Sequence, residues 1–158
     1  MDRTVIEIDR SKPFDLTNLC CGEGYYTVVN NETDSRSIAL KKLDITKVRF
    51  VTMLKDGESC IKGEEKLKRL KSAGHIRLDA KIFWVLWENE HLIPKSWRKK
   101  ASKKRATRFI HFDGLIFLDR TGLRHVPCLY WEHSEWHWCT DCLDSICGVD
   151  DPSAVLKV

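Results

Sequence analysis

The sequence predicts an α+β fold with an N-terminal hairpin, about three helices and a C-terminal antiparallel β-sheet. Apolar residues recur at helical spacing in the middle of the chain, and the period changes to two in the last third, where turn residues separate short apolar runs. Helices that pack on an antiparallel sheet give an α+β architecture. With 158 residues and no internal repeat, we expect one domain, 1–158, in which 1–119 form a scaffold and 120–151 a tryptophan-rich β segment with a loop.

The N-terminal part contains signals for strands. Polar and apolar residues alternate at 5–9, which predicts a short strand. Aromatic and β-branched residues at 25–29 (YYTVV) predict a second strand, and the polar stretch 30–35 predicts a turn. A return strand over 37–40 would complete a hairpin.

Three helices are predicted in the middle of the chain. Asp44 is suited to cap a helix over 45–54, where apolar residues follow helical spacing. A second helix is predicted over 64–72, because two glutamates each precede a cation by four residues. The third begins after Asp79 as its N-cap and ends before Pro94.

The last third of the sequence predicts an antiparallel sheet. Its four short strands are expected at 108–112, 115–118, 126–131 and 135–139. Asp113-Gly114 is the strongest local hairpin signal in the chain, and His133-Ser134 predicts another tight turn. The tail, 150–158, is expected to be a loose end.

Composition excludes a membrane protein and a disordered chain. Hydrophobic residues make up 42% of the sequence and charged residues 32%. The longest apolar run, 82–87, is far shorter than the ~20 residues of a transmembrane helix. The N-terminal residues contain no apolar signal-peptide segment, so we expect a cytoplasmic protein whose seven cysteines are mostly reduced thiols.

The C-terminal cysteines and histidines form the first candidate site. Cys139 and Cys142 are separated by two residues, a spacing with which two thiolates grip one zinc ion. Cys147 and His137 would complete a ligand set. Because a structural zinc site usually contains two such cysteine pairs, we expect scattered thiols and no cofactor, with zinc as the alternative.

A basic run forms the second candidate site. Its cations are Lys95, Arg98, Lys99, Lys100, Lys103, Lys104 and Arg105. With the aromatic Trp97 beside it, such a run is suited to follow a phosphate backbone, which makes nucleic acid an alternative partner. A charge run is more often a solvated loop, and the helix after Asp79 is too apolar to be a DNA-recognition helix.

The sequence shows no catalytic signature. It has no nucleophile elbow, no phosphate-binding glycine loop and no zinc-protease motif, and no local pattern pairs one cysteine with a histidine. Trp136 and Trp138 are two residues apart, so on a strand they point to one side, where we expect them to pack in the core. A non-catalytic binding module is therefore favoured over an enzyme.

Short motifs along the chain are similar to those of one bacterial protein family. They include DRSKPF at 9–14, GEEKLKRLK at 63–71 and LYW at 129–131. Further matching segments lie at 78–80, 86–89, 92–94, 96–97, 112–114 and 152–156. On these motifs, which cover nearly the whole chain, the protein resembles an uncharacterised family of small proteins from reduced-genome, candidate-phylum bacteria.

The resemblance implies a varied surface that binds a protein or a small ligand. Relatives look alike up to the LYW motif and then differ at scattered positions among tryptophans, as the variable proteins of diversity-generating retroelements do. Carried over, the varied positions are His133, Glu135, His137, Cys139, Thr140, Asp141, Ser145, Ile146 and Gly148. The implied ligand-binding residues are His133, Glu135, His137, Thr140, Asp141 and Ser145.

This chain departs from the family pattern in two places. Cys142 and Cys147 stand where relatives have tryptophan, and the stretch 98–105 is more basic than theirs. Both departures count against zinc and nucleic acid as functions common to the family.

Overall fold

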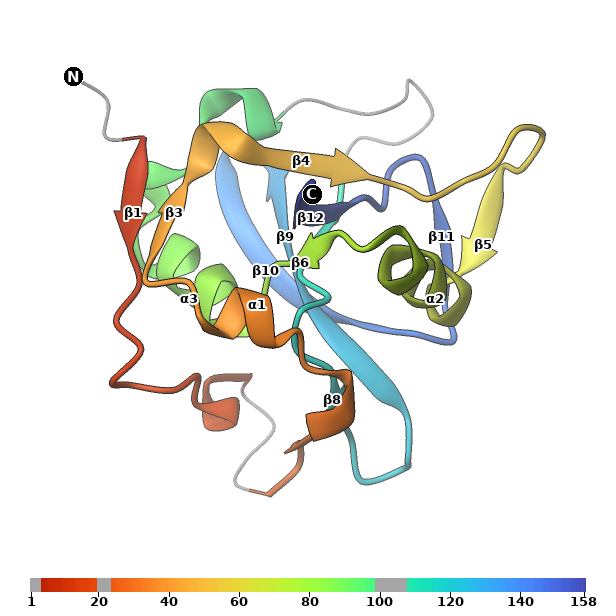
Figure 1. The fold of residues 1–158 in the computed structure, drawn as a ribbon, viewed down its shortest axis with the longest axis horizontal. Helices are drawn as coiled ribbons and strands as arrows, with labels where there is room; N and C mark the ends of the chain where they lie inside the picture. Colours follow the sequence, from red (N-terminus) through yellow and green to blue (C-terminus); the bar gives the residue numbers. More distant parts are fainter. Residues whose placement is uncertain (1–3, 20–23, 99–107) are drawn as a thin grey trace.

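The computed structural model describes residues 4–19, 24–98 and 108–158. Strands from both ends of the chain meet in one mixed sheet (Figure 1). Within the described ranges, its eight strands are β2 (Thr27–Val28), β4 (Val48–Val51), β6 (Ile76–Arg77), β7 (Ile110–His111), β8 (Phe117–Leu118), β9 (Arg124–Glu132), β10 (Glu135–Cys142) and β12 (Ser153–Leu156). They lie in the order β2-β8-β9-β7-β12-β4, with β10 beside β9 and β6 beside β12.

Two smaller sheets and three helices complete the described part of the chain. The smaller sheets pair β1 (Val5–Glu7) with β3 (Lys42–Asp44) and β5 (Cys60–Lys62) with β11 (Ile146–Gly148). The helices are α1 (Ser35–Ile38), α2 (Gly63–Ala73) and α3 (Ala80–Glu88). Among these described helices, none has the length and apolar character that crossing a lipid bilayer requires.

Helices α2 and α3 lie against opposite faces of the long strand β9. Leu129 belongs to the main core cluster together with Phe83 of α3, whereas Val126 clusters with Leu67 of α2. Successive side chains of a strand point to opposite faces of the sheet. Odd-numbered residues of β9 therefore face α3, and even-numbered residues face α2.

The predicted architecture is wrong, although helices and strands are both present. The C-terminal strands do not form a separate sheet. In the eight-stranded sheet, β12 from the end of the chain pairs with β4 from its first third. The N-terminal hairpin is wrong as well, since β2 pairs with β8 and the expected return strand is helix α1. Asp34 explains this helix, because its carboxylate accepts hydrogen bonds from the backbone nitrogens of Arg36 and Arg77.

The helix predicted over 45–54 is also wrong. Asp44 caps only a 3₁₀ turn, Ile45–Lys47, and the chain then extends as β4. This strand pairs with β12 from Val51 opposite Ser153 to Val48 opposite Leu156. Aromatic and β-branched residues suit a pleated strand, and a partner strand from the far end of the chain selects that conformation here.

The C-terminal tail is a central strand, not the expected loose end. β12 pairs with β4 on one side and with β6 and β7 on the other. Ser153, Ala154 and Val155 have no measurable solvent exposure. The tail is therefore part of the core of the sheet.

Elements with strong local signals match the predictions. Helix α2 covers the predicted span and ends at Gly74, whose φ of 73° is left-handed. Helix α3 begins after Asp79, whose side chain accepts a hydrogen bond from the backbone nitrogen of Lys81. The four predicted C-terminal strands correspond to β7, β8, β9 and β10, with shifted ends.

Gly114 has a different role from the predicted one. Asp113-Gly114 does not close a hairpin, because β7 and β8 each pair with β9 rather than with one another. Instead Gly114 lies against the chain that joins β6 to α3, and its nitrogen donates to the Leu78 carbonyl at 2.8 Å. A Cβ at this position would overlap the Arg77 carbonyl oxygen and lie 2.6 Å from the Leu78 carbonyl carbon.

We expect Gly114→Ala to destabilise the protein by more than about 3 kcal/mol, because the added methyl group meets backbone that cannot rotate away. Urea unfolding would measure the loss. Gly57→Ala is the matched control, since no atom lies near its Cβ position and only its positive φ opposes the change, at a cost of about 1–2 kcal/mol. Equal losses in the two variants would contradict this role of Gly114.

Candidate functional site

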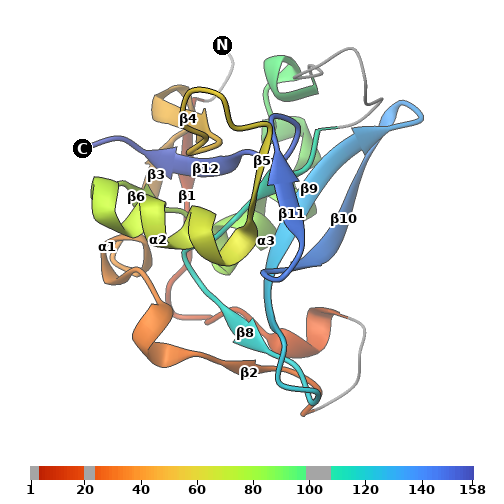
Figure 2. The same ribbon diagram turned by 90° about the vertical axis from the view of Figure 1, so that its right-hand side faces the viewer.

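The β9–β10 hairpin ends in a two-residue turn. His133 and Ser134 have φ values of 51° and 64°, the left-handed conformation that type I′ turns require at both central positions. This confirms the turn predicted at His133-Ser134. Figure 2 shows the hairpin running to a tip at the edge of the molecule.

The two faces of β10 carry different kinds of side chain. Trp136 and Trp138 pack with the main core, as predicted, and Trp138 lies 6.2 Å from the ring of Phe83 in α3. The residues between and beyond them point to the other face of the sheet, which is the α2 face. They are Glu135, His137, Cys139 and Asp141, and we call them the outer row.

Exposure falls along the outer row from the tip inward. The side chain of His133 at the tip is 85% exposed and that of Glu135 is 67% exposed. The values drop to 32% for His137 and 29% for Asp141. The part of this face that is open to a partner is therefore the tip half of the hairpin.

Aromatic packing holds His137 in place. Its ring stacks on Tyr130, with centroids 5.1 Å apart and an angle of 18° between the planes. Nε2 of His137 also lies 3.1 Å from the Glu132 carbonyl oxygen. Tyr130 in turn packs on Phe109 at 4.9 Å, so the exposed edge of His137 rests on a fixed aromatic support.

Asp141 at the inner end of the row belongs to a buried polar cluster. Oδ2 of Asp141 lies 3.1 Å from Nε2 of His111 on β7. Nδ1 of His111 lies 2.8 Å from Nζ of Lys66, which also donates to the Asp151 carbonyl oxygen at 3.0 Å. Since an ammonium group has no acceptor, Lys66 donates to Nδ1, and the ring hydrogen of neutral His111 is then on Nε2, facing Asp141.

The cluster keeps the Asp141 carboxylate charged. Burial would raise the pKa of Asp141, but the hydrogen bond from His111 and the positive charge of Lys66 outweigh it and lower the pKa. Lys66 itself has no measurable solvent exposure. Its neighbours must therefore offset the free-energy cost of burying its charge. The arrangement joins α2, β7 and β10 through one buried cation.

Cys128 and Cys147 are poor nucleophiles at neutral pH. Burial raises the pKa of Cys147 to about 11. Burial, together with the contact to Cys139, also raises the pKa of Cys128. A catalytic cysteine needs the opposite shift, because the thiolate is the reactive form. Neither Cys128 nor Cys147 is therefore activated as a nucleophile.

The remaining predicted ligand-binding residues do not share one face. Thr140 lies on the α3 side of β10, opposite Pro127. Ser145 is exposed in the turn after β10 and hydrogen bonds to the Asp141 carboxylate. Asp141 is engaged with His111. The structure therefore brings His133, Glu135 and His137 together at the open end of the hairpin.

The four residues of the alternative zinc site each lie next to a different residue. Cys139 lies opposite Cys128, Cys142 opposite His125, and Cys147 on β11 opposite Ile61. His137 stacks on Tyr130. In the part of the chain that the structure describes, no group of three or more histidine, cysteine or acidic side chains is placed to hold a metal ion.

Only two of the predicted nucleic-acid contacts lie within the described residues. Lys95 is exposed, whereas the guanidinium of Arg98 packs over the ring of Trp131 at 3.8 Å. Trp97, the aromatic beside the basic run, is buried against Phe50 and so is not available to stack on a base. The other predicted contacts, Lys99, Lys100, Lys103, Lys104 and Arg105, lie outside the described residues.

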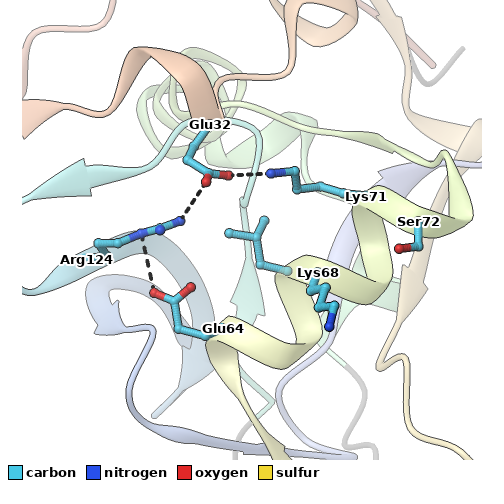
Figure 3. A pocket seen from close by; sticks show the side chains of 7 residues that line it. Glu32, Glu64, Lys68, Lys71, Ser72 and Arg124 are labelled. Carbon is cyan, nitrogen blue, oxygen red and sulfur yellow. Dashed lines mark hydrogen bonds and ion pairs between the residues drawn. The ribbon is translucent and has the colours of Figure 1, made fainter.

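A small open pocket of about 260 Å³ lies beside α2 (Figure 3). Arg124 stands between two carboxylates there, 3.3 Å from Glu32 and 3.4 Å from Glu64, and Lys71 is 2.8 Å from Glu32. Burial would raise the pKa of Glu32, but Lys71 and Arg124 outweigh it and lower the pKa. These charges neutralise one another, so the pocket links α2 to β9 rather than offering free ligand-binding groups.

A larger open groove of about 840 Å³ lies on the other side of α2. Its lining includes apolar side chains from β4 and the segment after it, such as Val51 and Leu54. Basic side chains, among them Lys68 and Lys157, line it as well. Every residue implicated by the sequence lies outside this groove.

Comparison of the chain with protein-family models, with curated proteins and with solved structures finds no match. The arrangement of the hairpin and of the buried cluster is therefore the basis for any functional proposal.

Sequence reasoning missed Lys66 and His111. Lysine is almost never fully buried, so a lysine in a charged helix indicates a solvated face. The available signal is the position of Lys66 next to Leu67 and four residues before Leu70, which places it on the apolar side of α2. His111 gives no such signal, because its partners come from two distant segments.

We expect Lys66→Met to destabilise the protein by about 3 kcal/mol, because Nδ1 of His111 and the Asp151 carbonyl lose their donor and Asp141 loses its nearby cation. Urea unfolding would measure this. Lys68→Met, an exposed position on the same helix, is the control and should stay within about 0.5 kcal/mol of wild type. A Lys66→Met protein as stable as wild type would contradict the role of the cluster.

Proposed function

We propose that the protein is a non-catalytic binding module whose contact surface is the open end of the β9–β10 hairpin. The observation that carries this proposal is the segregation of side chains on β10. Trp136 and Trp138 pack with the core, while His133 and Glu135 are exposed and His137 is half-buried at the open end of the hairpin. Such an arrangement lets contact residues vary without disturbing the fold.

The exposed residues combine rigid support with polar groups. His137 rests on Tyr130 and Phe109, which fixes its position before any ligand arrives. Glu132 and Glu135 flank it with carboxylates at the turn. Recognition surfaces commonly combine aromatic anchors that lose little entropy with adaptable polar contacts. The partner class is a protein or a small ligand.

The backbone of β10 offers a second means of contact. Among the described strands, β10 pairs only with β9, so its other edge has no strand partner. An extended segment of a protein partner can add to such an edge through main-chain hydrogen bonds, while side chains of the strand provide specificity. This feature favours a protein over a small ligand as the partner.

The proposal predicts that the contact residues are dispensable for folding. We expect the triple variant His133→Ala, Glu135→Ala and His137→Ala to keep its melting temperature within a few degrees of wild type, as surface changes usually do. Trp138→Ala, on the same strand but the opposite face, should lose about 3–5 kcal/mol. Thermal and urea unfolding give both values, and a collapse of the triple variant would refute a free contact surface.

A test of the function itself is the natural variation of this gene. The similarity to retroelement-varied proteins predicts that amino-acid changes concentrate at 133–148, on outer-row positions such as Glu135 and His137. The neighbouring Trp136 and Trp138 are the internal control and should stay constant. Deep sequencing of the gene from its natural population gives the distribution. Changes spread evenly along the chain would remove the support for a diversified binding surface.

A further inference from the structure

Two cysteines face each other across the β9–β10 hairpin. Cys128 on β9 is the direct cross-strand partner of Cys139 on β10. Their Sγ atoms are 2.6 Å apart, and the Cys128 thiol also lies 3.4 Å from the Cys139 carbonyl oxygen. Directly opposed residues of an antiparallel pair lie at the Cα separation that disulfides need. The two sulfur atoms are therefore close enough to be joined in a disulfide bond.

The two thiols differ in access to solvent. Cys139 is half-buried in the outer row, between His137 and Asp141, whereas Cys128 has no measurable exposure. A reagent from solution therefore reaches Cys139 first. Cys128 lies beside Cys139 on β9, which is flanked by β10 on one side and by β7 on the other, and its sulfur contacts that of Cys139.

We propose that Cys128 and Cys139 form a thiol–disulfide exchange site that takes up a low-molecular-weight disulfide and closes to a cross-strand disulfide. The chemistry that this geometry suits is sequential exchange, with Cys139 as the attacking thiol and Cys128 as the resolving thiol. The site stands independently of the binding function proposed above, since it rests on the sulfur contact alone.

The exchange balances in two steps. The Cys139 thiolate attacks one sulfur of the external disulfide, releases one thiolate and forms a mixed disulfide on Cys139. The Cys128 thiolate then attacks the Cys139 sulfur and releases the second thiolate. Overall the two protein thiols lose two electrons and two protons, and the external disulfide is reduced to two thiols.

Burial should make the second step the slower one. The raised pKa of Cys128 leaves little thiolate at neutral pH, and thiolate is the attacking species. The mixed disulfide on Cys139 is therefore expected to be observable before the pair closes. Closure would also fix the register of β10 on β9 covalently, two residues from His137 on the same face.

The test uses full-length wild-type protein and glutathione disulfide as the probe. Intact mass spectrometry and non-reducing peptide mapping should find a bond between Cys128 and Cys139, with loss of both thiols and their recovery after dithiothreitol. The oxidised form should unfold at a higher temperature than the reduced form, because the cross-link restricts the unfolded chain.

Single variants separate the two roles. Cys128→Ser should stop at the mixed disulfide on Cys139, while Cys139→Ser should leave Cys128 unmodified. Cys60→Ser, which removes an exposed thiol elsewhere, is the control and should form the bond as wild type does. The proposal is overturned if wild-type protein is modified at Cys60 with no bond between Cys128 and Cys139. It is equally overturned if Cys139 bonds to a different cysteine.

Discussion

The pairing of β12 is the interaction on which the rest of the structure depends. Its backbone joins β4, β6 and β7, and thereby connects the first third of the chain with the last. The residues just before it add further contacts, since the Pro152 carbonyl accepts from His111 and the Asp151 carbonyl accepts from Lys66. A buried strand without these partners would leave its peptide groups unpaired, which is costly in the absence of water.

A buried cation links this sheet to the hairpin. Lys66 reaches from α2 to His111 on β7, and His111 faces Asp141 on β10. Burying an ammonium group costs free energy that only neighbouring acceptors and counter-charge offset. The contacts of Lys66 with His111 and of His111 with Asp141 therefore fix where the inner end of β10 lies relative to α2. The open end of the same strand carries no such constraint.

Strand β10 of the hairpin thus has a fixed inner half and a free half towards the tip. The tryptophans on one face pack with α3, and the inner end of the other face is held by His111. Towards the tip, Glu135 and His133 project into solvent from a rigid base. Cys139 lies at the boundary between these halves, in contact with the buried Cys128. Its oxidation state would therefore change the stiffness of the strand next to the exposed residues.

The sequence by itself determined the elements whose causes are local. Asp79 and Gly74 fix the ends of helices, His133-Ser134 fixes a tight turn, and the alternation of β10 separates its tryptophans from its polar residues. These signals act within a few residues of the backbone they shape.

Only the tertiary structure decided the sheet order, the role of Gly114 and the burial of Lys66. The segment 48–51 has helical spacing in sequence but forms a strand, because β12 supplies hydrogen-bond partners from the other end of the chain. Gly114 belongs to a dipeptide that is typical of turns. A glycine is needed there because the backbone of Arg77 and Leu78 leaves no room for a Cβ atom. In each case the deciding contact joins residues far apart in sequence, and local propensity is too weak to oppose it.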